Sequence, residues 1–182
     1  MAIPTNIKTL LSGEVVEWAR IEFKETWDAA ASLKTICAFA NDLDNWGGGY
    51  IVIGVEENNG RPVYPLMGVS TDKLDVYQKS IYAKCKLIRP AYSPIIGVET
   101  YQDKQFIVIW CPGGDNRPYS SPKTMARDNK ERRADFNMRP IYVGENPYKG
   151  TYKRNHEGDY HATEHEIRGM IRRNVIYENE SA

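Results

Sequence analysis

The sequence has no net charge, because 24 Lys and Arg side chains are matched by 24 Asp and Glu. This balance excludes a polycation that coats nucleic acid by bulk attraction, so any binding of a polyanion must come from a local cluster of charge. Long apolar runs are also missing. The longest have six residues, as in Tyr50–Val55, whereas a membrane-spanning helix needs about 20. The N-terminus has neither the basic start nor the apolar stretch of a signal peptide.

Cysteine is scarce, and the spacing of the three residues does not match a metal-binding motif. Cys37, Cys85 and Cys111 lie far apart in apolar stretches without a CxxC pair. An odd number of such residues argues against a disulfide framework and indicates buried thiols in a reducing cytoplasm. A Walker A loop for ATP is missing too. The glycines at 47–49 precede a predicted strand and Lys149 precedes its glycine, so both stretches are predicted turns.

The length suits one domain, and the hydrophobic periodicity predicts an α/β (α+β) fold with a mixed β-sheet flanked by helices. We expect a single domain over residues 1–174 and a tail at 175–182 that begins a linker to further domains. The predicted helices cover 3–13, 32–42, 71–88 and 163–174. The predicted strands cover 15–24, 50–55, 95–101, 105–111, 140–143 and 150–154, and residues 115–149 form a basic loop inserted before the closing strand and helix.

Three acids are candidates for a functional site: Glu17, Glu22 and Glu56. Glu56 follows the buried strand, at the edge where α/β sheets place their sites. Converging carboxylates could hold Mg²⁺ or Mn²⁺ for phosphodiester hydrolysis, with Lys24 near the phosphate. On a straight strand Glu17 and Glu22 would be about 16 Å apart on opposite faces, so they converge only if the chain bends near 18–20. The alternative interpretation is three solvated acids, one of them paired with Lys24. Alternative members of the cluster are Glu14 and Glu57.

Positive charge is concentrated in residues 117–154, which hold ten basic side chains against four acidic ones. Aromatic residues are interleaved with them. Basic side chains contact phosphates and aromatic faces stack on exposed bases, so this mixture suits nucleic acid. A solvated loop whose aromatic residues pack back onto the core is the alternative. The cations predicted to bind nucleic acid are Arg117, Lys123, Arg127, Lys130, Arg132, Arg133, Lys149, Lys153 and Arg154.

Several stretches together resemble the Schlafen AlbA-type domain, which opens many prokaryotic transcriptional regulators and RecG-helicase-like, divergent AAA proteins. The stretches are VEWARIEFK (16–24), ICAFAND (36–42), WGGGYIVIGVEE (46–57), Arg89-Pro90, Arg117-Pro118-Tyr119, GTYKR (150–154) and ATEHEI (162–167). The resemblance implies a compact α/β domain with a role in nucleic-acid binding. Residues 123–149 depart from the short link that is usual in the family at this point.

In vertebrate Schlafen relatives, two glutamates five residues apart, the second within EFK, form a metal-dependent RNase centre with an acid just after the GV strand. Glu17, Glu22 and Glu56 match these positions. Our first hypothesis is therefore a DNA-binding module of a cytoplasmic transcriptional regulator or helicase-like protein, with DNA or RNA as its partner and no membrane association. The second is a Mg²⁺- or Mn²⁺-dependent nuclease. The third is a protein-interaction or dimerisation module, for example a homodimer.

Overall fold

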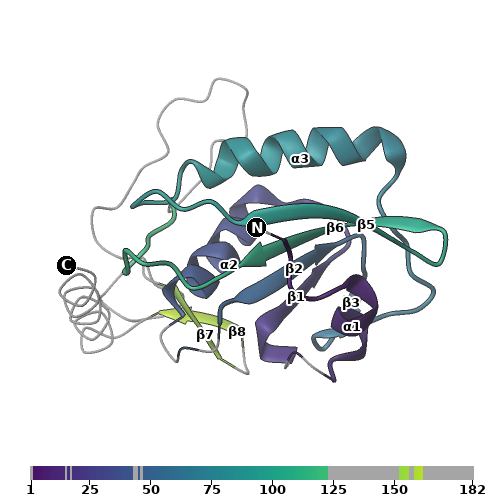
Figure 1. Ribbon diagram of the computed structural model, residues 1–182, viewed down its shortest axis with the longest axis horizontal. Coiled ribbons are helices and arrows are strands. Elements are labelled where there is room, and N and C mark those ends of the chain that lie inside the picture. Colours follow the sequence, from purple (N-terminus) through teal and green to yellow (C-terminus); the bar gives the residue numbers. More distant parts are fainter. Residues whose placement is uncertain are drawn as a thin grey trace.

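A four-stranded mixed sheet forms the centre of the molecule (Figure 1). Its strands lie in the order β1-β2-β6-β5; β1 and β2 are parallel, and β6 is antiparallel to both of its neighbours. The bounds are β1 (Ile21–Lys24), β2 (Gly49–Ile53), β5 (Ile95–Tyr101) and β6 (Lys104–Cys111). The computed structural model describes residues 2–14, 16, 18–42, 45 and 47–122, and the backbone of 152–155 and 158–161.

The sheet separates two apolar cores. Alternate side chains of β2 point to opposite faces: Ile51 and Ile53 join the core beneath the two long helices, whereas Tyr50 and Val52 join the core beside the short N-terminal helix. Every residue of β2 is buried, which explains its continuous apolar run. In the described part of the chain the α-helices are α1 (Ile7–Ser12), α2 (Ala29–Asn41) and α3 (Thr71–Cys85), and Figure 1 shows α3 running alongside the β5–β6 hairpin. The predicted α/β fold with a mixed sheet and flanking helices is confirmed.

A polar cap marks the start of α2, and a glycine marks the end of α1. The carboxylate of Asp28 accepts a hydrogen bond from the Ala31 backbone N–H, so α2 begins three residues earlier than its apolar periodicity predicts. At the end of α1, Gly13 takes the left-handed conformation with φ of +67°. The three cysteines are buried and free, as predicted. No helix in the described part of the chain combines the length and hydropathy that crossing a membrane would require.

The predicted strand over 15–24 is wrong in its first half. A 3₁₀ helix, η1 (Trp18–Arg20), precedes β1, and the strand itself begins at Ile21. The alternation of apolar and polar residues starts only at Ile21. The predicted strand was therefore too long at its N-terminal end. The Arg20 Nε donates to the carbonyl oxygen of Gly48 at 2.8 Å and fastens η1 to the segment before β2.

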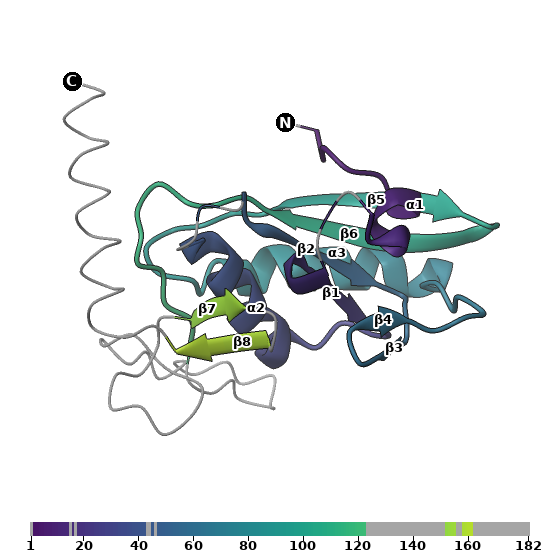
Figure 2. The same ribbon diagram turned by 90° about the horizontal axis from the view of Figure 1, so that it is seen from below.

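Among the described residues, two small hairpins lie outside the main sheet. One joins β3 (Glu57–Asn58) to β4 (Arg61–Pro62). The other joins β7 (Tyr152–Asn155) to β8 (Gly158–His161), and Figure 2 shows it lying against α2. The sequence indicated a strand over 150–154 but missed β8. The predicted strand at 140–143 and helix at 163–174 lie outside the described residues, as do most of the basic loop and the tail, so the domain bounds stay a prediction.

Candidate functional site

Glu22 and Lys24 lie on one face of the edge strand β1, on the side of the sheet that α2 and α3 cover. This follows from their register, in which Glu22 is opposite Ile51 and Lys24 opposite Ile53. The Lys24 Nζ is 3.5 Å from the Glu22 Oε1, and the side chains are 17% and 28% exposed. Partial burial strengthens such a pair relative to one in open solvent. The ion pair that the sequence offered as an alternative interpretation is therefore present.

The end of β1 is tied to the segment that leads to Glu56. The Lys24 carbonyl oxygen accepts from the backbone N–H groups of Gly54 and Val55, at 2.7 and 3.1 Å. Glu56 follows, with an exposed side chain and a carbonyl oxygen that accepts from the Val63 N–H at 2.8 Å. Glu56 thus lies just beyond the carboxyl end of β2, as the sequence predicted, and its carboxylate is accessible to solvent.

Glu17 lies outside the described residues. However, the structure does describe residues 18–20, where the chain must bend if Glu17 and Glu22 are to converge. A straight strand would hold Glu17 and Glu22 far apart on opposite faces, whereas η1 occupies residues 18–20 between them. A 3₁₀ helix rises about 2 Å per residue and turns the chain, compared with about 3.3 Å for a strand. The bend that convergence requires is present. Within the described residues no three His, Cys, Asp or Glu side chains are grouped as metal ligands, so the three-acid centre stays a prediction.

Arg117 is the one predicted nucleic-acid contact whose side chain lies in the described part of the chain. Its Nη1 donates to the carbonyl oxygens of Asp42 (2.8 Å) and Asn41 (3.2 Å), and its Nε donates to that of Gly114 (2.8 Å). The first two carbonyls belong to the C-terminal end of α2, where a helix leaves carbonyl groups unpaired and favours a cation. Arg117 therefore has a structural role that the sequence did not reveal.

A buried polar contact next to Arg117 also joins the end of α2 to the segment at 117–119. The side-chain amide of Asn41 accepts from the Tyr119 N–H at 2.6 Å and donates to the Tyr119 carbonyl oxygen at 3.2 Å. Both residues are buried. Two motifs far apart in sequence, AND at 40–42 and RPY at 117–119, thus form one structural unit.

Among the other predicted cations, Lys153 and Arg154 lie on β7. Their backbone pairs with Tyr160 and Asp159 of β8, and β7 lies close to α2 and η1. The hairpin therefore lies beside η1, which precedes the amino-terminal end of β1. The remaining predicted contacts lie outside the described residues; they are Lys123, Arg127, Lys130, Arg132, Arg133 and Lys149.

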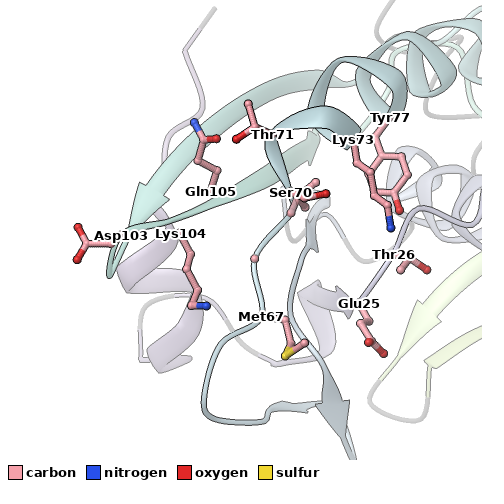
Figure 3. A pocket seen from close by; sticks show the side chains of 12 residues that line it. Glu25, Thr26, Met67, Ser70, Thr71, Lys73, Tyr77, Asp103, Lys104 and Gln105 are labelled. Atoms are coloured by element: carbon pink, nitrogen blue, oxygen red, sulfur yellow. The ribbon is translucent and has the colours of Figure 1, made fainter.

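A pocket of about 390 Å³ opens at the opposite end of β1 (Figure 3). Its walls come from the residues after β1, the loop before α3, the first turns of α3 and the β5–β6 turn. Sequence analysis did not find this pocket, because its walls are brought together from three distant segments. The lining residues are Glu25, Thr26, Met67, Gly68, Val69, Ser70, Thr71, Lys73, Tyr77, Asp103, Lys104 and Gln105.

Comparison with known protein families gives a match to the model "Schlafen, AlbA_2" over residues 17–163, most of the chain. The chain belongs to the Schlafen AlbA_2 family. Its fold is similar to the solution structure of the N-terminal domain of a candidate ATP-dependent DNA helicase RecG-related protein from Nitrosomonas europaea. The TM-score is 0.51 and the identity 25%, over 74% of this chain and 92% of that one.

A second solved structure, the DIP2311 protein of Corynebacterium diphtheriae, matches this AlbA_2 chain at 14% identity with a TM-score of 0.48. The match covers 86% of the AlbA_2 chain but 29% of the other chain. None of the curated proteins compared with this chain matches it. The region matched by the family model contains both described candidate acids, Glu22 and Glu56, as well as the whole lining of the pocket.

Proposed function

We propose that this AlbA_2 domain is a nucleic-acid-binding module, specifically the DNA-binding part of a transcriptional regulator or helicase-like protein. The observation that carries the proposal is the likeness to the N-terminal domain of the RecG-related protein. The likeness extends over 92% of that domain, so it concerns the domain as a whole and not a shared supersecondary motif. The family assignment over residues 17–163 supports the same function.

The distribution of charge supports this proposal. Although the chain is neutral overall, residues 117–154 carry an excess of six positive charges. The described end of this segment, β7 with Lys153 and Arg154, lies against α2 beside η1. A cationic surface confined to one side attracts phosphates there, and the compensating negative charge elsewhere limits indiscriminate binding. We further propose a cytoplasmic location, since free buried thiols are typical of a reducing compartment.

The test is binding of labelled DNA and RNA, single- and double-stranded, measured over a range of salt concentrations. A module that contacts phosphates loses affinity linearly in log–log form, with a slope of about 0.7 to 0.9 per neutralised phosphate. The double variant Arg132→Gln/Arg133→Gln should lower that slope by about 1.4 on a single strand. Lys79→Gln/Lys86→Gln is the matched control, because both lysines are exposed on or at the end of α3. Absence of binding at low salt contradicts the proposal and favours the protein-interaction module or homodimer.

A metal-dependent nuclease is the second candidate, and η1 is the observation that favours it. The bend at residues 18–20 removes the straight-strand objection to a Glu17, Glu22 and Glu56 centre. Carboxylate oxygens are the donors that Mg²⁺ and Mn²⁺ prefer, and a bound cation would polarise a phosphodiester. Glu22 and Glu56 supply such oxygens. Lys24, 3.5 Å from Glu22, would then neutralise negative charge on the phosphate.

Cleavage of labelled RNA and single-stranded DNA with Mn²⁺ tests the nuclease. Wild type should cleave, and Glu22→Gln and Glu56→Gln should each remove most of the activity, because each loses a charged oxygen donor. Glu57→Gln is a control for Glu56→Gln, since Glu57 is the neighbouring exposed acid. Equal cleavage rates for wild type and Glu22→Gln would contradict the nuclease hypothesis without affecting the proposed binding function.

A further inference from the structure

The pocket at the carboxyl end of β1 has a fixed frame. The Gly68 N–H donates to the Gly54 carbonyl oxygen at 2.8 Å, and the Val69 N–H donates to that of Gln105 at 2.7 Å. These bonds hold the loop before α3 against the ends of β2 and β6. A volume of about 390 Å³ falls within the range of small-molecule sites, which starts at about 300 Å³, and it lies at the sheet edge where α/β proteins bind ligands.

Two cations enter this space from different walls. Figure 3 shows Lys73 extending from α3 toward Thr26, and Lys104 extending from the start of β6 toward Met67. Within the residues that the structure describes, neither lysine makes an ion pair or a side-chain hydrogen bond. In contrast, Lys79 on the same helix pairs with Asp75 at 2.7 Å. Lys73 and Lys104 are therefore available to a ligand.

The acids of the pocket are directed outward. In Figure 3 the carboxylate of Asp103 points away from the turn and that of Glu25 points away from α3. In the first turn of α3, the pKa of Asp72 is lowered by hydrogen bonds from the Ser70 hydroxyl and from backbone N–H groups of the helix start, and also by the charge of Lys73. An anion in the pocket would consequently be held by the two lysines and nearby hydroxyl groups, and not by the helix end.

We propose that this pocket binds the phosphate group of a nucleotide, with Lys73 and Lys104 as its cationic contacts. The hydroxyl of Thr26 supplies a polar contact, and the ring of Tyr77 with the side chain of Met67 gives the sugar and base an apolar surface. The phosphate belongs to a nucleic-acid strand or to a free nucleotide. The first source rests on the proposed function, because it would extend the binding surface from β7 along the edge strand β1 to the pocket.

The experiment uses the full chain and two probes, a fluorescein-labelled oligothymidylate and adenosine 5′-monophosphate. Lys73→Gln and Lys104→Gln should each weaken binding about three- to tenfold, whereas Lys79→Gln should not change it. Glu25→Gln and Asp103→Asn should strengthen binding about twofold, because each removes a negative charge from the rim. All five side chains are exposed, so thermal unfolding should be the same in every variant.

The two probes separate the sources and the two proposals. If the lysine variants bind both probes more weakly than wild type does, the result supports a pocket that binds the phosphate of a nucleic-acid strand. Binding of the mononucleotide alone supports the pocket with a free nucleotide and contradicts the proposed function. If the strand binds but the lysine variants behave like Lys79→Gln, the pocket proposal is overturned and the proposed function stands. If wild type binds neither probe, both proposals are wrong.

Discussion

Arg117 donates from its Nη1 to the carbonyl oxygen of Asp42 at 2.8 Å, across 75 positions of sequence. The contact closes the C-terminal end of α2, where Asp42 takes a left-handed conformation with φ of 30°. A residue that looks like the first cation of a basic segment is thus part of the core architecture. This distinction matters when basic residues are substituted to find a binding surface, because loss of Arg117 would lower the stability of the fold as well as remove a charge.

Arg117→Ala should lower the free energy of unfolding by about 1–3 kcal/mol, since three carbonyl oxygens lose charged hydrogen-bond donors. Urea unfolding followed by circular dichroism measures the change. Lys86→Ala is the control, because Lys86 is exposed at the end of α3, and surface substitutions usually stay within about 0.5 kcal/mol. A loss no larger than that of Lys86→Ala would show that the contacts with α2 contribute little.

The pair formed by Glu22 and Lys24 should have a measurable coupling energy. A double-mutant cycle with Glu22→Gln and Lys24→Met should give about 0.5–1 kcal/mol, above most exposed pairs, because both side chains are largely buried. The pair Asp75 and Lys79, exposed on α3 at 72% and 77%, provides the comparison and should give about 0.3 kcal/mol. Equal couplings in the two cycles would mean that burial on β1 adds nothing.

Glu99 should make stability depend on pH. One carboxylate oxygen is buried without a hydrogen-bond partner, and burial raises the pKa of this group above its ordinary 4.5. The folded state therefore binds the proton more tightly than the unfolded state does, so stability falls as the pH rises from the ordinary pKa through the raised one. Glu99→Gln, which cannot ionise, should remove this dependence and be more stable than wild type at neutral pH.

Urea midpoints at pH 5 and 7 measure the effect of Glu99→Gln. Glu14→Gln is the matched control, because Glu14 is an exposed acid. If the difference between wild type and Glu99→Gln is the same at the two pH values, the buried carboxylate oxygen is not the cause.

Substitution of Gly48 and of Gly60 by alanine separates two costs of adding a Cβ atom: the strain of a left-handed backbone and a steric clash with a neighbouring residue. Their φ angles are almost the same, +74° and +75°, but a Cβ at Gly48 would collide with the carbonyl group of Cys111, whereas nothing lies within 4 Å of one at Gly60. Gly60→Ala should cost about 1–2 kcal/mol for the left-handed backbone. Gly48→Ala should cost at least about 3 kcal/mol, because the backbone of the paired strand must also move. Thermal unfolding of both variants provides the measurement, and equal losses would contradict the clash.

The main helices and the strands of the four-stranded sheet could be predicted because each has its own local pattern. The fully apolar run at 50–55 predicts a strand covered on both faces, and the period of apolar residues in 32–42 predicts a helix with one buried side. The family resemblance likewise depends on short motifs such as EFK at 22–24, which the family match confirms. The position of Glu56 beyond a strand end follows from the same patterns.

Other features depend on contacts between distant segments. The bend at η1 is fixed by the bond from Arg20 to Gly48, and the pocket is formed by segments that start near residues 25, 67 and 103. Neither feature leaves a periodic pattern in the sequence, because each depends on contacts between segments that lie far apart in the chain.

The neutral charge and its uneven distribution belong to the sequence by itself, and so do the family motifs and the order of the main helices and sheet strands. Only the tertiary structure decided that Arg117 donates hydrogen bonds to the C-terminal end of α2, that Glu22 pairs with Lys24, and that two lysines from separate elements line one pocket. The physical reason is that local periodicity reports which face of an element is buried, whereas the partner of a polar side chain depends on which segments the packed core brings together.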